Sequence, residues 1–106
     1  MQNQSIPTII FSRYKNLTTL EPKKLGIRKK IALFVSTNED DVTTLILHIT
    51  QKSRFLQKDV DKMEEIIETI MSYLSLNHTK KVILIDSPLC SKANSKLELQ
   101  EWAVLS

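Results

Sequence analysis

The sequence predicts one small α/β domain, in which a short mixed or parallel sheet is packed by helices. Two strongly apolar runs, residues 31–35 and 82–85, have the composition of strands that are buried on both faces. Between them, residues 59–75 carry apolar side chains at the spacing of an amphipathic helix. The chain has 106 residues, of which 42% are hydrophobic, so we expect a single hydrophobic core.

The first part of the chain, residues 1–30, is a basic N-terminal leader that holds seven Lys or Arg side chains against Glu21 alone. Within it, residues 8–12 are a β-branched and aromatic run that follows Pro7. This run predicts a first strand, at an edge of the sheet. We expect the α/β core domain itself to occupy residues 31–106.

The segment after the predicted strand near residues 31–36 is ambiguous. Three carboxylates at residues 39–41 suit the first turn of a helix, because they complement its dipole. Apolar side chains then recur at helical spacing, at Val42, Leu45, Ile46 and Ile49. This spacing favours a helix near residues 39–53. The same stretch is rich in β-branched residues, so a hairpin that turns at 38–41 and continues as a strand over 42–50 stays open.

The last part of the chain predicts a helix, a strand and a shorter element. The apolar side of residues 59–75 is broad enough to dock on a sheet. Residues 81–86 form a second buried strand, which ends before Pro88. A short helix is predicted near residues 96–104, and a strand over 97–105 stays open as the alternative.

Several classes of site are excluded by the rarity of glycine and cysteine. Gly26 is the single glycine, so the glycine-rich loops that bind phosphates or dinucleotides have no place in this chain, and we expect no cofactor. Cys90 is the single cysteine, which rules out an internal disulfide and favours the cytoplasm. No apolar run approaches the roughly 18 residues that a membrane span needs, so we expect no membrane partner.

The leading functional hypothesis is a small non-enzymatic module that binds another protein or a second copy of itself, as an accessory or assembly subunit. On the helical interpretation of residues 39–53, some apolar side chains fall away from the buried stripe, and the helix near 59–75 is apolar over a wide arc. A homodimer or a heteromeric contact would cover that surface. The residues expected to bind the partner are Leu47, Phe55, Met63, Met71, Tyr73 and Trp102.

The alternative hypothesis is that the protein associates with nucleic acid through its basic N-terminal segment, because clustered cations attract phosphates. The residues expected to take part are Arg13, Lys15, Lys23, Lys24, Arg28, Lys29 and Lys30. A Lys-Lys pair precedes each of the two apolar runs. If those strands are parallel neighbours, both pairs lie at the same end of the sheet and add to this basic surface.

We predict neither a catalytic residue nor a metal site. The carboxylates that would hold Mg²⁺ or handle a phosphate, if the strands' carboxyl ends meet, are Asp40, Asp41 and Asp86. Helix capping and strand exit explain the same carboxylates without a metal. His48 is expected to be a half-buried packing residue, and Cys90 a small buried hydrophobe.

Overall fold

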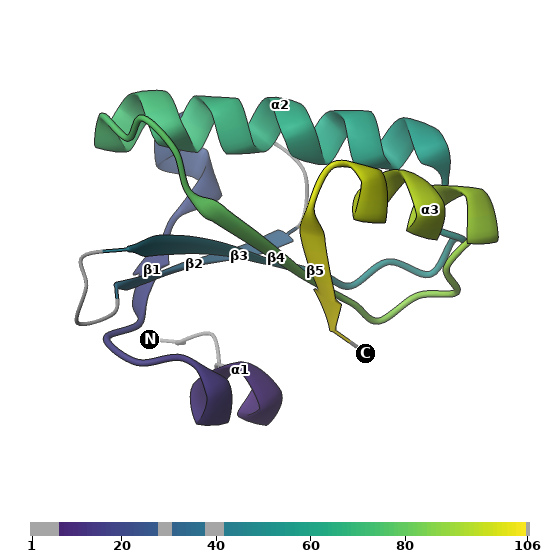
Figure 1. Cartoon of the computed structure of the whole chain (residues 1–106), viewed down its shortest axis with the longest axis horizontal. Coiled ribbons are helices and arrows are strands. Elements are labelled where there is room, and N and C mark those ends of the chain that lie inside the picture. The colour runs from purple at the N-terminus through teal and green to yellow at the C-terminus, as the bar shows by residue number, and fades with distance from the viewer. Residues whose placement is uncertain (1–6, 28–30, 38–41, 106) are drawn as a thin grey trace.

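The computed structural model describes residues 7–27, 31–37 and 42–105, and it shows a five-stranded sheet with helices on both faces (Figure 1). The strands are β1 (Thr18–Leu20), β2 (Ile31–Thr37), β3 (Thr43–Ile49), β4 (Lys80–Ile85) and β5 (Trp102–Leu105). The helices are α1 (Thr8–Arg13), the short 3₁₀ helix η1 (Pro22–Leu25), α2 (Gln57–Leu74) and α3 (Ser91–Leu99). The predicted α/β class with a mixed sheet is confirmed.

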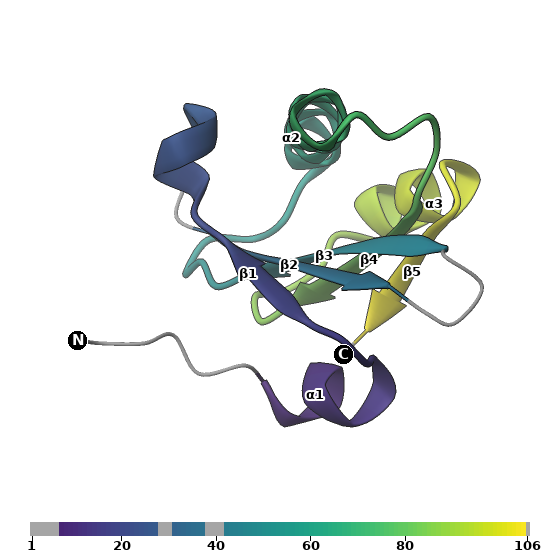
Figure 2. The ribbon, with the colours of Figure 1, turned by 90° about the vertical axis from the view of Figure 1, so that its left-hand side faces the viewer.

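The sheet follows the chain order, β1-β2-β3-β4-β5. The pairs β1–β2 and β2–β3 are antiparallel, whereas the pairs β3–β4 and β4–β5 are parallel. The two parallel connections contain α2 and α3, which lie together on one face of the sheet (Figures 1 and 2). Helix α1 lies on the opposite face. We call these two sides the α2 face and the α1 face.

Helix α2 confirms the helix predicted near residues 59–75. Its buried side chains recur three or four residues apart, at Val60, Met63, Ile66, Ile67 and Ile70. At its start, the carboxylate of Asp59 accepts a hydrogen bond from the backbone N–H of Leu56 at 2.8 Å. At its end, Ser75 adopts the left-handed conformation with φ 57°, and its N–H returns to the carbonyl of Met71. Both ends of this helix are therefore satisfied by local contacts.

The strand predicted near residues 8–12 is wrong, because this segment forms α1. The carbonyl of Pro7 accepts hydrogen bonds from the N–H groups of Ile10 and Phe11 at 3.0 and 2.9 Å, which closes the first turn. Ile10 is completely buried on the α1 face of the sheet. The helix buries Ile10 against the sheet although its neighbours have the β preference that predicted a strand.

The helix predicted near residues 39–53 is also wrong, because residues 43–49 form the central strand β3. Its side chains alternate: Leu45, Leu47 and Ile49 pack on the α2 face, and Ile46 packs on the α1 face. A central strand covered on both faces is apolar on both, so apolar residues can coincide with helical spacing. The alternative prediction of a strand over residues 42–50 is therefore the correct one, and this strand pairs antiparallel with β2. The turn predicted at residues 38–41 lies outside the described residues.

The helix predicted near residues 96–104 is correct only as far as Leu99. Helix α3 begins earlier, at Ser91, and Glu101 turns the chain with φ 65° before β5 begins. Strand β5 pairs parallel to β4. Of the alternative strand over residues 97–105, the last four residues, 102–105, are therefore a strand.

The core consists of two apolar clusters separated by the sheet. The larger cluster lies between the α2 face and helices α2 and α3, and the smaller one lies between the α1 face and α1. Within the described part of the chain, no helix is long and apolar enough to cross a bilayer.

Candidate functional site

A cleft of about 1010 Å³ opens on the α1 face of the sheet, at the end where β2 finishes and β4 begins. We call it the basic cleft. Its walls come from the end of α1 with the segment that follows it, and from the residues at the start of β5. Its floor is the surface of the sheet between them. The lining residues are Arg13, Tyr14, Lys15, Asn16, Ser36, Thr44, Thr79, Lys80, Lys81, Val82, Glu101 and Ala103.

The floor of the basic cleft is a row of small polar side chains on three adjacent strands. Ser36 of β2 pairs with Thr44 of β3, which in turn pairs with Lys80 of β4. The next row towards α1 is apolar, and there Val82 pairs with Ala103. Serine, threonine, valine and alanine are short side chains, so the sheet surface stays open beyond the end of α1.

Three cations of the lining form no ion pair with any described residue, and they are Arg13, Lys15 and Lys80. The carboxylate of the lining is Glu101. Lys81 also borders the cleft, but its ammonium group pairs with Glu64 on the α2 face. Counted over the described side chains, the basic cleft therefore carries an excess of uncompensated positive charge.

Three side-chain hydrogen bonds hold the walls of the cleft in place. The hydroxyl of Ser36 donates to the carbonyl of Lys15 at 2.6 Å, which ties the segment after α1 to β2. The amide of Asn16 donates to the carbonyl of Thr37 at 3.0 Å. Across the sheet, the hydroxyl of Thr79 donates to the carbonyl of Thr43 at 2.9 Å. These bonds preorganise the walls, because each anchors one segment to its neighbour.

One hydroxyl on the floor of the cleft has no hydrogen-bond partner among the described residues. Thr44 is only 8% exposed, lies on the cleft floor beside Lys80, and its hydroxyl makes no hydrogen bond within the described part of the chain. The phenol of Tyr14, which is half-buried in the wall, also lacks a hydrogen-bond partner there. A buried polar group usually has a partner. The cleft thus offers hydrogen-bond donors as well as positive charge to a ligand.

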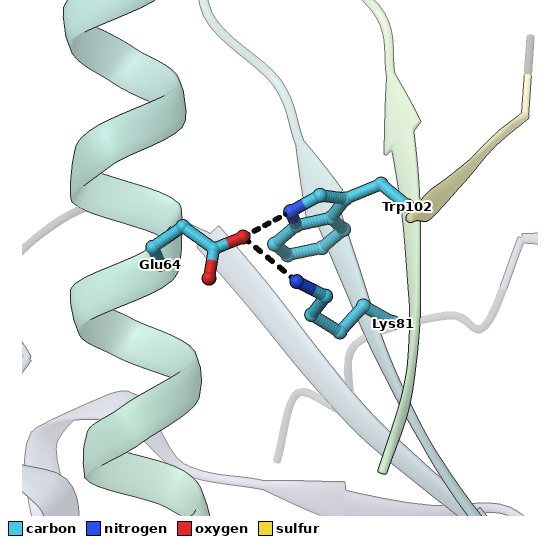
Figure 3. A network of polar contacts seen from close by, with 3 residues as sticks. All are labelled: Glu64, Lys81 and Trp102. Carbon is cyan, nitrogen blue, oxygen red and sulfur yellow. Dashed lines mark hydrogen bonds and ion pairs between the residues drawn. The ribbon is translucent and has the colours of Figure 1, made fainter. Parts of the chain in front are cut away.

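A polar network between α2, β4 and β5 explains why Lys81 contributes no free charge to the cleft (Figure 3). Glu64 accepts hydrogen bonds at the same carboxylate oxygen from the Lys81 ammonium at 2.9 Å and from the Trp102 indole N–H at 2.5 Å. The Lys81 ammonium also lies 5.3 Å from the centre of the Trp102 ring. These contacts satisfy three partly buried groups at once, and their role is to hold α2 against the sheet.

A second polar pair lies at the other end of the parallel strands. Nε2 of His48 is 2.7 Å from the carboxylate of Asp86, and the two residues follow the same face of β3 and β4. His48 is half-buried, as expected from the sequence. The pair joins the C-terminal ends of β3 and β4.

Most of the residues expected to form an apolar partner surface lie inside the core. Leu47, Phe55, Met63 and Trp102 are buried, so the expectation that they are available to a partner is wrong. The sheet is the physical reason, because β3 takes the place of the predicted helix and α2 covers its α2 face. Met71 is half-buried, and Tyr73 is 59% exposed near the end of α2.

The residues expected to bind nucleic acid divide into separate groups. Arg13 and Lys15 line the basic cleft. Lys23 and Lys24 lie on η1, which packs on the α2 side of the sheet. Arg28, Lys29 and Lys30 lie outside the described residues.

The parallel neighbouring strands that would place the two Lys-Lys pairs at one end of the sheet do not form, and Lys29 and Lys30 lie outside the described residues. Strands β2 and β4 are separated by β3 and run in opposite directions. The first residue of β2, Ile31, and the last residue of β4, Ile85, both pair with Ile49, so the start of β2 and the start of β4 lie at different ends of the sheet. The sequence by itself predicts no site at Lys80. Its position one strand away from Thr44 depends on a register that the sequence does not reveal.

Of the three candidate carboxylates for a metal, Asp86 is the one that lies within the described residues. Asp86 follows the last residue of β4, whereas β2 ends near the first residue of β4, at the other end of the strands. Asp40 and Asp41 lie outside the described residues. Among the residues that the structure describes, no group of three or more His, Cys, Asp or Glu side chains has the geometry of a metal site.

Cys90 lies at the start of α3 and is half-buried rather than buried. The backbone N–H groups of Ala93 and Lys92 hydrogen-bond to its sulfur and lower the pKa of the thiol, and the charges of Arg54 and Lys92 act in the same direction. This environment favours the thiolate.

Comparison with known proteins identifies the fold only. No protein-family model matches the chain, and no curated protein matches it either. Among solved structures, EndoMS in its apo form superposes with a TM-score of 0.54 at 15% sequence identity. The match covers 74% of this chain but only 32% of the EndoMS chain. The chain thus corresponds to about a third of that protein, and at this identity the likeness concerns architecture alone.

Proposed function

We propose that this protein binds nucleic acid and that the basic cleft holds the phosphate backbone. The observation that carries the proposal is the convergence of Arg13, Lys15 and Lys80 on one cleft, with no ion-pair partner among the described residues. Arg13 and Lys15 belong to the basic segment from which the sequence suggested nucleic-acid association. Lys80 joins them from β4, 65 or more residues further along the chain.

The chemistry of the cleft supports a phosphate ligand over other anions. Phosphates in nucleic acids are bound by Arg and Lys together with hydroxyl and amide donors, which position the backbone without reading the bases. The cleft supplies cations from two segments and the free hydroxyls of Thr44 and Tyr14. A single carboxylate, Glu101, opposes them among the described lining residues.

Protein binding through an apolar surface remains the competing proposal, with less support. The large exposed hydrophobic side chains among the described residues are Phe11, Leu56, Tyr73 and Leu99. They belong to α1, the segment before α2, the end of α2 and the end of α3, and therefore do not form one helix face. Isolated apolar side chains of this kind are common on monomeric proteins.

The decisive experiment compares two triple variants by the fluorescence anisotropy of a labelled oligonucleotide. Arg13→Ala/Lys15→Ala/Lys80→Ala removes the cleft cations, and Arg54→Ala/Lys58→Ala/Lys62→Ala removes three exposed cations outside the cleft. Each triple variant lowers the formal net charge from +3 to 0. The cleft variant should bind at least about tenfold more weakly than the control variant.

The matched net charge makes the result specific to the site. If both triple variants lose affinity equally, binding depends on overall charge and the cleft is not the site. If the unmodified chain does not bind the oligonucleotide at low salt, the proposed function is wrong. Circular dichroism of each variant establishes that the fold is retained.

A further inference from the structure

Beyond the cations, the basic cleft has an aromatic wall that a simple phosphate site would not require. Tyr14 lines the cleft and packs against the smaller apolar cluster, which restricts its ring. Phe11 lies three residues earlier on α1, and its side chain is 68% exposed although it is large and apolar. The N–H of Tyr14 bonds to the carbonyl of Ile10, but the backbone of Tyr14 itself is extended, so Tyr14 is the residue at which α1 ends.

Tyr14 directly follows the last residue of α1 and lines the cleft, whereas Phe11 lies on α1 and is not among the lining residues. Phe11 and Tyr14 alternate with Arg13 and Lys15 in the sequence, so aromatic side chains and cations occur in the same short segment. Proteins that bind single strands combine cations with aromatic side chains on which unpaired bases stack.

The floor of the cleft adds an independent observation. Thr44 is more than nine-tenths buried as a residue, its hydroxyl has no hydrogen-bond partner within the described residues, and it lies beside Lys80 on the neighbouring strand. A ligand must enter the cleft to reach it. The backbone of a single strand is narrow enough to do so, whereas a duplex presents two backbones wrapped around a stack of paired bases.

We propose that the ligand is single-stranded nucleic acid, whose bases stack on Phe11 and Tyr14 while one phosphate contacts Lys80 and the Thr44 hydroxyl. This inference rests on the proposed function and specifies the form of nucleic acid bound. In a duplex, base faces are already stacked on one another and are not available to these rings. The aromatic wall therefore discriminates between the two forms, while the cations attract both.

The test measures affinity for one labelled oligonucleotide as a single strand and as the annealed duplex, with free inorganic phosphate as a competitor. We expect the single strand to bind about tenfold more tightly than the duplex at the same salt concentration. Phe11→Leu and Tyr14→Leu keep an apolar side chain but remove the ring, and each should weaken single-strand binding by about tenfold. Tyr14→Phe retains the ring and should retain most of the affinity.

The floor contact has its own matched pair of variants. Thr44→Val removes the hydroxyl with little change of shape and should weaken binding of the single strand by about threefold to tenfold. Thr43→Val makes the same change one residue earlier, outside the cleft lining, and should leave the affinity unchanged.

The outcomes separate this inference from the function on which it rests. Equal affinity for strand and duplex, with Phe11→Leu and Tyr14→Leu unaffected, would overturn the single-strand assignment and leave nucleic-acid binding in place. Displacement of the strand by inorganic phosphate at a similar concentration would overturn it in favour of a small phosphate site. Absence of binding to either form would overturn both proposals. Because Phe11 is exposed, its variant tests stacking without disturbing the core.

Discussion

At the residue scale, two small polar side chains distinguish the cleft from the rest of the α1 face. Ser36 and Thr44 are both buried, but among the described residues only the hydroxyl of Ser36 has a hydrogen-bond partner, the carbonyl of Lys15. These two residues should therefore respond in opposite directions when their hydroxyl groups are removed.

We expect Thr44→Val to raise the free energy of unfolding by up to about 1 kcal/mol, because it replaces a hydroxyl that has no hydrogen-bond partner among the described residues by a methyl group of similar shape. Ser36→Ala should lower the free energy of unfolding by about 1 kcal/mol, because it breaks a made hydrogen bond. Urea denaturation followed by circular dichroism measures both. A loss of stability in Thr44→Val would mean that its hydroxyl has a partner and would weaken the case for a ligand contact.

The Glu64 carboxylate should contribute more to stability than a surface ion pair. Glu64→Ala leaves two partly buried donors, Lys81 and Trp102, without their acceptor, and should cost about 1–3 kcal/mol. Asp61→Ala, which breaks the more exposed pair with Lys96, should cost at most about 1 kcal/mol. Trp102 is the single tryptophan, so its fluorescence reports unfolding in both variants.

The Cys90 thiol should react as a more acidic group than an ordinary cysteine. The hydrogen bonds from Ala93 and Lys92 lower its pKa in the folded chain, so at a given pH below the usual titration range a larger fraction is thiolate. The rate of alkylation by iodoacetamide should rise at a lower pH in the folded protein than in the urea-unfolded protein. Identical pH profiles in the two states would contradict the hydrogen bonding at the start of α3.

At the element scale, helix α2 could be predicted from its period, and strands β2 and β4 could be predicted from their apolar composition. Helix α2 has one buried side, and β2 and β4 are short apolar runs bounded by polar residues. Strand β3 could not be predicted by period, because its two covered faces remove the alternation that marks a strand. Helix α1 escaped prediction because six residues give too little periodicity to oppose their β preference.

The C-terminal cap of α2 provides a test at this scale. Ser75 adopts φ 57°, a conformation that glycine accepts without steric strain. Ser75→Gly should therefore raise the free energy of unfolding, by up to about 1 kcal/mol. Ser72→Gly, inside the same helix, should lower it by about 1 kcal/mol. Equal destabilisation by both glycines would contradict the left-handed cap.

At the scale of the whole molecule, the mixed topology decides which charges meet. Because β2 runs antiparallel to β3 and β4 runs parallel to it, the end of β2 lies beside the start of β4. In this arrangement Lys80 lies in the same cleft as the segment that follows α1, and Asp86 lies at the other end of the strands. A fully parallel sheet, which the sequence left open, would have reversed both placements.

The salt dependence of binding follows from this arrangement. If Arg13, Lys15 and Lys80 each contact one phosphate of a single strand, the slope of log K against log salt should be about −2. Affinity should then fall by roughly fifteenfold between about 50 mM and about 200 mM salt. The Arg13→Ala/Lys15→Ala/Lys80→Ala variant should show a slope near zero. An unchanged slope in that variant would assign the phosphate contacts to other cations.

The sequence alone determined the α/β class, the docking helix and two of the buried strands, and it pointed to Arg13 and Lys15. These conclusions depend on local composition and spacing, which follow from the burial of one side of each element. Tertiary structure alone decided that residues 43–49 are a central strand and that Thr44, Lys80 and Tyr14 surround one cleft. Strand order and register arise from pairing between distant segments, and such pairing leaves no periodic trace in the residues that it brings together.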